Sequence, residues 1–167
     1  MATALLTGIY FDTGGFRHQN TTNEVLSIVS ELLKKGARLN KITENIDNQR
    51  PISLFKLWGI ALDRLRLNKK YGLSVSVITM EDIEKAGATE EEISGLVNLL
   101  NSAPESSVAL LLCESFGDKI KGSLRTESDQ IDISKLAKSL GGGGHKKAAG
   151  FTINGRIELE DGSWKIV

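Results

Sequence analysis

The residues best suited to chemistry lie near the C-terminus, where four consecutive glycines, 141–144, precede His145, two lysines and Ala148-Ala149-Gly150. Glycine has no Cβ, so the backbone of such a segment can come within hydrogen-bond reach of a ligand. Successive backbone N–H groups form a concave nest for anions, and the histidine and lysines add cationic donors. The run fits neither G-x-x-x-x-G-K-[ST] nor G-x-G-x-x-G. It predicts a phosphate or other anion site, and the alternative is a flexible glycine-rich linker.

A second candidate segment, residues 119–126, alternates polar and apolar residues like a half-buried strand. On a strand, Lys119, Lys121, Ser123 and Arg125 share one face, and Arg125 can bind a phosphate through two parallel hydrogen bonds. The alternative is a solvated strand face, which we expect for Lys119. For Ser123 and Arg125 we predict phosphate binding, because the next helix and the glycine run return the chain toward this strand.

A third candidate is Asp12, which follows a buried segment and precedes Thr13 and two glycines. A carboxylate in this position is suited to binding a divalent cation through oxygen. Thr13, Asn20 and Thr21 are candidates to orient it. An Asx turn leading into a helix explains the segment equally well. Asp-Thr-Gly also occurs in aspartic proteases, but these need two such aspartates in an all-β setting, which this helix-rich chain does not provide.

Composition limits the possible functions. The 167 residues include 21 Lys+Arg and 21 Asp+Glu, so the formal net charge is zero and anion binding must be local. Cys113 is the only cysteine, and His18 and His145 are the only histidines, which excludes an intramolecular disulfide and a zinc site built by this chain alone. No apolar run approaches the ~18 residues of a membrane span, and no signal peptide is recognisable. We expect a cytoplasmic protein with no membrane partner.

The first part of the chain is predicted to be helical. Residues 2–11 are a buried helix or a buried strand, because periodicity cannot distinguish the two in so short a run. Thr21 and Glu24 have the spacing of a capping box that opens a helix, which Gly36 ends. Two more helices are expected at residues 40–48 and from Ser53 to about Tyr71.

From residue 73 onward, strand and helix patterns alternate. Thr79 and Thr89 have the spacing of helix caps, and Asp132 is expected to cap a further helix over 133–140. This order predicts an α/β fold with a mixed sheet and helices packed against it. The boundary with the helical part is expected within residues 49–72. Strands are predicted at residues 73–79, 107–114, 119–126, 151–153 and 163–167.

Together the three candidate segments resemble the DHH phosphoesterase superfamily, and most closely its nano-RNase and 3′,5′-bisphosphate nucleotide phosphatase branch. Residues 6–22 are similar to the last catalytic motif of that family, whose aspartate is a manganese ligand. Residues 123–126 and 141–150 are similar to two signatures of the DHH-associated C-terminal domain, which grips substrate phosphate and nucleotide. The resemblance implies that Asp12 is a catalytic metal ligand. It implies these substrate-binding residues: Ser123, Arg125, Thr126, Gly142, Gly143, Gly144 and His145.

The resemblance also implies a division of the chain. Residues 1–50 correspond to the C-terminal part of the DHH catalytic domain, 51–71 to a connecting helix and 72–167 to the substrate-binding domain. Members of this branch carry further aspartates, histidines and the Asp-His-His tripeptide before the Asp12 motif, and this chain has none of them. A two-metal site needs several ligands to lower the pKa of a bridging water. We therefore predict the C-terminal half of an enzyme, from truncation or a split gene, which is inactive alone.

The expected function is manganese-dependent hydrolysis of short oligonucleotides or 3′,5′-bisphosphate nucleotides, with Mn²⁺ held only in the complete enzyme. The expected partners are the phosphate-bearing substrate and either the missing N-terminal DHH half or a homodimer partner. The alternative is a non-catalytic module that binds nucleic acid or nucleotides, because the same C-terminal domain is appended to alanyl-tRNA synthetases. A pure interaction domain is disfavoured by the phosphate-loop signature.

Overall fold

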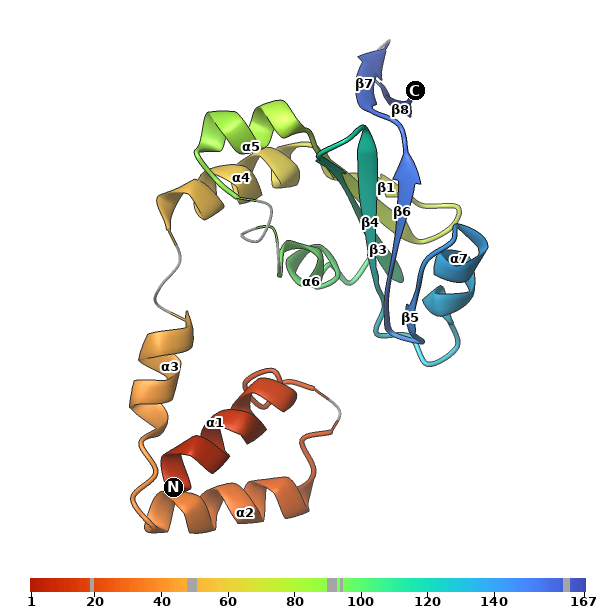
Figure 1. The fold of residues 1–167 in the computed structure, drawn as a ribbon. Coiled ribbons are helices and arrows are strands. Elements are labelled where there is room, and N and C mark those ends of the chain that lie inside the picture. The colour runs from red at the N-terminus through yellow and green to blue at the C-terminus, as the bar shows by residue number, and fades with distance from the viewer. Residues whose placement is uncertain (19, 48–50, 90–92, 94, 161–162) are drawn as a thin grey trace. The chain divides into compact units, whose positions relative to one another are not determined.

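The computed structural model describes residues 1–18, 20–47, 51–89, 93, 95–160 and 163–167. They belong to two compact units, Met1–Arg50 and Pro51–Val167. The first unit consists of helices α1 (Ala2–Asp12), α2 (Asn23–Lys34) and α3 (Leu39–Asp47) (Figure 1).

The N-terminal unit is held together by a small apolar cluster. Leu6 of α1 is fully buried and packs among residues of α2, α3 and the turn between them: Val29, Leu32, Ala37 and Ile42. Residues 2–11 all lie in α1, so of the two alternatives that the sequence left open, helix and strand, the helix is the one observed. The predicted cap at Thr21 is wrong by one residue. The extended backbone of Thr22 places its hydroxyl where it accepts the Val25 N–H at 3.3 Å.

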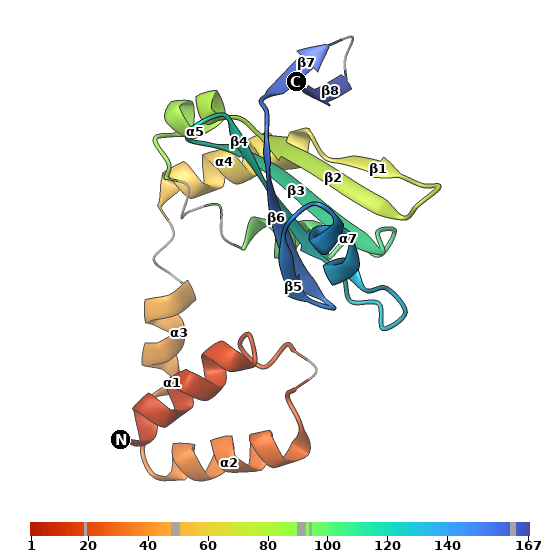
Figure 2. The same ribbon diagram turned by 45° about the vertical axis from the view of Figure 1, so that its right-hand side comes forward.

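The C-terminal unit contains a six-stranded sheet with the order β1-β2-β3-β4-β6-β5 and a separate β7–β8 hairpin (Figure 2). Strands β2 and β3 are parallel and the other neighbours are antiparallel, so the predicted mixed α/β sheet is confirmed. Its elements in chain order are α4 (Ile52–Asp63), β1 (Arg66–Asn68), β2 (Leu73–Ile78), α5 (Met80–Ala86), α6 (Leu96–Leu100), β3 (Val108–Ser115), β4 (Lys119–Arg125), α7 (Ile133–Ser139), β5 (Gly143–His145), β6 (Ala148–Asn154), β7 (Ile157–Glu160) and β8 (Ser163–Ile166).

Helices cover both faces of this sheet. On one face, α4, α5 and α6 pack against the β3 side chains Ala109, Leu111 and Cys113. On the other face, α7 packs through Ile133 and Ala137 against β4 and β6. Figure 1 shows α4–α6 on one side of the strands and α7 on the other. Strand β3 thus has apolar neighbours on both faces, as its nearly continuous apolar sequence predicts.

Two predicted helix caps are confirmed. The Thr79 hydroxyl accepts the Asp82 N–H while the Asp82 carboxylate accepts the Thr79 N–H, which makes a complete capping box at α5. Asp132 accepts the Ser134 N–H at 3.1 Å and opens α7. The helix start predicted at Thr89 involves residues outside those described. The sequence Asp161-Gly162 also predicts a turn before the last strand, and these two residues too lie outside those described. The described helix after Thr89 is α6, which follows Gly95.

The helix predicted from Ser53 to Tyr71 is too long. Helix α4 ends at Asp63, and the chain continues as strand β1, in which Arg66 pairs with Val75. Arg64 still has helical dihedral angles and donates its N–H to the Ile60 carbonyl at 3.1 Å. Its guanidinium forks onto Asp82, with Nη2 donating to Oδ1 at 2.8 Å. Two short strands, β5 within the glycine run and β7 after it, are also absent from the sequence prediction.

Candidate phosphate-binding site

Strands β4, β6 and β5 bring four of the predicted site residues onto one face of the sheet. Ser123 lies opposite Gly150, which lies opposite Gly143, and Arg125 and His145 both lie opposite Ala148. Paired residues on neighbouring strands, and every second residue along a strand, project from the same face. The predicted shared face of β4 is therefore confirmed, and it includes Gly143 and His145. Lys119 and Lys121 continue it along β4.

The side chains on this face remain accessible in the C-terminal unit. Helices α4–α6 cover β2 and β3, whereas Ser123, Arg125 and Gly150 are half-buried and His145 is exposed. Gly143 and Gly150 lie at the centre of this face and have no side chains. A ligand can therefore come close to the strand backbone there. The arrangement suits a flat or shallow anion ligand with cationic groups around it.

Arg125 is fixed by two hydrogen bonds from its guanidinium. Nε donates to Oδ1 of Asn98 on α6 at 2.9 Å, and Nη1 donates to the Leu124 carbonyl at 2.8 Å. Of the five N–H donors of a guanidinium, these bonds leave three for a ligand. Burial lowers the pKa of Arg125 below its ordinary value. It remains a cation at neutral pH because that ordinary value is so high. Asn98 is a positioning residue that no sequence pattern revealed.

The structure explains the four consecutive glycines in different ways. Gly141, at φ +76°, and Gly142 end α7 in a Schellman motif, in which the Gly142 N–H donates to the Ala137 carbonyl at 2.8 Å. A Cβ on Gly142 would lie 2.1 Å from the Gly150 oxygen, and one on Gly144 would lie 2.6 Å from the Ala148 oxygen. Gly142 and Gly144 are thus required by close packing onto β6.

Gly143 is different from its neighbours. A Cβ there would meet nothing within 4 Å, and its φ is not in the left-handed region. The protein itself therefore has no steric need for glycine at this position. Because Gly143 shares the open face with Ser123 and Arg125, the missing side chain leaves room for a ligand next to the strand.

Thr126, also predicted to bind substrate, is almost fully buried at the end of β4. Its hydroxyl donates to the Ser107 carbonyl at 2.6 Å and accepts the Ser128 N–H at 3.1 Å. The structure thus gives Thr126 a role in fixing the loop after Arg125.

The two lysines after His145 are engaged with Asp129. Lys147 forms an ion pair with the Asp129 carboxylate at 2.8 Å, and Lys146 donates to the Asp129 carbonyl. The hydrogen bond from Lys147 lowers the pKa of Asp129. These contacts tie the loop before α7 to the turn between β5 and β6, and so stabilise the position of His145.

Asp12 is exposed at the C-terminal end of α1. Its Oδ2 accepts a hydrogen bond from the Asn20 side-chain amide at 2.9 Å, so Asn20 orients it as predicted. Thr13 does not, because its hydroxyl donates to the Ile9 carbonyl at 2.7 Å and accepts the Phe16 N–H. The Thr21 hydroxyl has no hydrogen-bond partner in the described part of the chain.

The residues around Asp12 do not fit a complete manganese centre. Among the described residues, no group of three or more His, Cys, Asp or Glu side chains could hold a metal ion. A lone exposed carboxylate can contribute one oxygen ligand, which is fewer than a hydrolytic metal site needs. The described residues of this chain therefore do not supply the ligand set of a two-metal hydrolytic site.

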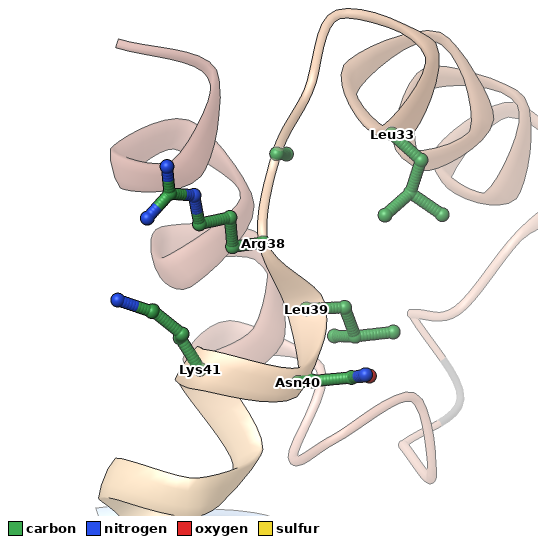
Figure 3. A pocket seen from close by; sticks show the side chains of 6 residues that line it. Leu33, Arg38, Leu39, Asn40 and Lys41 are labelled. Atoms are coloured by element: carbon green, nitrogen blue, oxygen red, sulfur yellow. The ribbon is translucent and has the colours of Figure 1, made fainter.

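Two surface hollows are lined by none of the residues Ser123, Arg125, Gly143 and His145. One, of about 530 Å³, is in the N-terminal unit at the α2–α3 connection, where Figure 3 shows Arg38 and Lys41 on one side and Leu33 and Leu39 on the other. The other, of about 370 Å³, lies beside Phe116 and the first residue of β4. No predicted site residue lines either hollow. Among the described helices, none is long and apolar enough to cross a membrane.

Comparisons with known proteins agree with this architecture. The DHHA1 domain model matches residues 72–163. The bifunctional oligoribonuclease and PAP phosphatase NrnA of Thermus thermophilus is 39% identical over 155 residues, which are 93% of this chain and 45% of that protein. The A-adding tRNA nucleotidyltransferase of Geobacter sulfurreducens is 25% identical over 95% of this chain and 18% of that protein.

A solved structure has the same fold. The crystal structure of an exopolyphosphatase-related protein from Bacteroides fragilis matches with a TM-score of 0.84 and 30% identity, over 90% of this chain and 44% of that one. The chain spans about half the length of the NrnA relative and of this structure. The predicted resemblance to DHH phosphoesterases is confirmed, and the chain belongs to the DHHA1 domain family.

Proposed function

We propose that this chain supplies the substrate-phosphate site of a cytoplasmic, manganese-dependent phosphoesterase that hydrolyses short oligonucleotides or 3′,5′-bisphosphate nucleotides. The observation that carries the proposal is the shared open face of β4, β6 and β5, on which Ser123, Arg125, Gly143 and His145 lie in two adjacent rows. The similarity to a protein named as an oligoribonuclease and PAP phosphatase supports the substrate class.

The proposed roles follow from the chemistry of each group. The guanidinium of Arg125 donates two N–H bonds to phosphate oxygens, with Ser123 and His145 as further donors. Gly143 lets the phosphate approach the strand. These groups bind and orient the substrate, which lowers the entropic cost of the reaction. In the complete enzyme, Asp12 contributes one oxygen ligand to manganese, and the other ligands come from an N-terminal DHH half or a partner subunit.

Replacing Arg125 by alanine is expected to weaken binding of a 5′-phosphorylated RNA dinucleotide about ten- to a hundredfold, because a charge-assisted bond to phosphate is lost. Arg125→Lys should recover only part of the affinity, because an ammonium lacks the planar fork. Calorimetric titration of the purified chain measures the change. Lys119→Ala, on the same strand, is the control. Unchanged affinity of Arg125→Ala would show that this face is not the phosphate site.

The isolated chain is expected not to hydrolyse the dinucleotide when Mn²⁺ is added, and to bind Mn²⁺ only weakly. Asp12→Asn should leave dinucleotide binding unchanged, because Asp12 supplies a metal ligand and no phosphate contact in this proposal. Product analysis and a manganese titration followed by electron paramagnetic resonance test both points. Turnover by the isolated chain would contradict the proposed need for further metal ligands.

A second candidate function is binding without hydrolysis. It is favoured by the match to a protein named as a tRNA nucleotidyltransferase, of which this chain covers only 18%. The two candidates are distinguished by adding a separately expressed N-terminal DHH domain. Hydrolysis that depends on both parts supports the enzyme, and binding that never leads to product supports the module.

A further inference from the structure

Helix α4 carries an exposed apolar stripe opposite its buried side. The buried side contains Leu57 and Ala61, which pack in the core between this helix and the sheet. On the other side, Ile52, Phe55 and Leu62 are 73%, 55% and 45% exposed. Their spacing of three and seven residues places them along one stripe of the helix surface. Three exposed apolar side chains on one side of a short helix are typical of an interaction surface.

Gly59 lies in the middle of this stripe. A Cβ at Gly59 would meet nothing within 4 Å, and its φ is not in the left-handed region. Glycine inside a helix lowers the stability of the helix relative to alanine. Nothing in the described part of the chain therefore requires glycine here. A missing side chain on an exposed helix surface does, however, allow a second backbone to approach closely.

Two exposed charged residues, Lys56 and Asp63, form one edge of the stripe, and Phe55 and Leu62 form the other edge. The members of each pair are seven residues apart, and both pairs have their midpoints next to Gly59. Neither Lys56 nor Asp63 forms an ion pair within the described part of the chain. The stripe thus has an apolar edge and a charged edge, both centred on the same glycine.

This pattern is complementary to itself when two copies of α4 run antiparallel. In a twofold-symmetric contact, the same pair of residues meets twice, once from each side. If the helices cross at Gly59, Phe55 lies against Leu62 of the partner subunit, and Lys56 lies against Asp63 of the partner subunit. Each pair differs in height along the helix axis by one residue, about 1.5 Å. A parallel pair would instead place each apolar edge against a charged edge, so the pattern favours the antiparallel arrangement.

We propose that two copies of this chain associate through antiparallel α4 helices, with Gly59 at the crossing point. A helix of twelve residues is about 18 Å long, so the contact is smaller than a standard stable interface. The dimer is therefore expected to dissociate at micromolar or higher concentrations. The inference is independent of the proposed phosphate site, because none of its residues lies on β4, β5 or β6.

Sedimentation equilibrium of the purified chain, from low micromolar to submillimolar concentration, measures the dissociation constant of the dimer. Gly59→Ala is expected to weaken the dimer about tenfold, because the added methyl group holds the helices apart. The same substitution should raise the melting temperature of the dilute monomer, because alanine stabilises a helix. A weaker dimer formed by a more stable monomer cannot result from misfolding.

A charge reversal tests the identity of the partner. Lys56→Glu should weaken the dimer, because the new carboxylate faces Asp63 of the partner subunit. Adding Asp63→Lys to this variant should restore the dimer, since opposite charges again face each other across the contact. Lys135→Glu is the matched control with no effect, because Lys135 is an exposed helical lysine on α7, on the other face of the sheet.

Three outcomes would overturn the proposal. A chain that stays monomeric at submillimolar concentration leaves the stripe to another occupant, such as the N-terminal unit or a different protein. A dimer that neither Gly59→Ala nor Lys56→Glu weakens forms through another surface. A double variant of Lys56 and Asp63 that does not recover the dimer contradicts the antiparallel contact between two α4 helices.

Discussion

Replacing Gly142 with alanine is expected to lower the free energy of unfolding of the C-terminal unit by about 3 kcal/mol, the upper part of the range for overpacked sites. The added Cβ would lie 2.1 Å from the Gly150 oxygen and 2.6 Å from the Phe151 Cα. Both atoms belong to the backbone of β6, so no side-chain rotation relieves the clash. Urea unfolding followed by tryptophan fluorescence measures the loss, because Trp58 and Trp164 both lie in this unit.

Gly143→Ala is the matched control, with opposite expectations. A Cβ there has no neighbour within 4 Å, so stability should change by no more than about 1 kcal/mol. The methyl group would project from the face shared with Ser123 and Arg125, however, so under the proposed function dinucleotide affinity should fall. If Gly142→Ala and Gly143→Ala lower the free energy of unfolding equally, it is wrong that Gly142 is required by packing and Gly143 is not. If Gly143→Ala binds normally, the phosphate does not approach this position.

Replacing Asp82 with alanine is expected to destabilise the same unit by about 3 kcal/mol, because it leaves the Arg64 guanidinium without its partner and α5 without half of its capping box. Asp82 is 5% exposed and accepts both Arg64 N–H groups, the Thr79 N–H at 2.8 Å and the Thr79 hydroxyl at 2.7 Å. Arg64 also lies 4.6 Å from the centre of the Trp164 ring. Through its bonds to Arg64, the Asp82 carboxylate thus links α5 to the end of α4 and to the β7–β8 hairpin.

Glu81→Ala provides the control for the Asp82 variant. Glu81 forms an ion pair with Lys85 on the same helix, but both side chains are about 70% exposed. Such surface pairs contribute at most about 1 kcal/mol. Unfolding of both variants in urea at neutral pH gives the comparison. A loss for Asp82→Ala as small as that for Glu81→Ala would contradict the importance of the buried pair.

The same carboxylate makes stability depend on pH. Burial alone would raise the pKa of Asp82, but hydrogen bonds from Arg64 and Thr79 outweigh it, and the pKa lies below its ordinary value. The folded state therefore binds this proton less readily than the unfolded chain. The resulting stabilisation is complete above the unfolded pKa of about 3.9. It is lost as the pH falls through the lower pKa of the folded state. Asp82→Asn should lack this part of the acid dependence.

Local patterns predicted many elements of the fold. Alternation predicted β2 and β4, the spacing of Thr79 and Asp82 predicted the start of α5, and Asp132 predicted the start of α7. The end of α4 was not predictable in this way. The residues that follow, Arg66–Asn68, pair with β2 as strand β1, so a tertiary contact overrides their helix propensity.

The candidate site was predictable only in part. The period of two in β4 placed Ser123 and Arg125 on one face, but that face is completed by strand pairing that no local pattern specifies. Gly143 and His145 join it because β5 pairs with β6 and β6 with β4. Asn98 lies 27 residues before Arg125, on an exposed part of α6. An exposed asparagine on a helix gives no indication in the sequence that it contacts Arg125. The requirement for glycine at 142 and 144, but not at 143, likewise depends on where the β6 backbone lies, which no local pattern shows.

The order of the strands places the two sides of the candidate site on strands that differ in how many hydrogen-bonded neighbours they have. Ser123 and Arg125 lie on β4, which has a hydrogen-bonded neighbour on each flank, whereas Gly143 and His145 lie on β5, a three-residue strand at the edge of the sheet. An edge strand with one neighbour separates locally at a lower free-energy cost than an internal strand. In the proposed site, a ligand of a different shape can therefore displace β5, with Gly143 and His145, at a lower free-energy cost than it can displace β4, which carries Arg125.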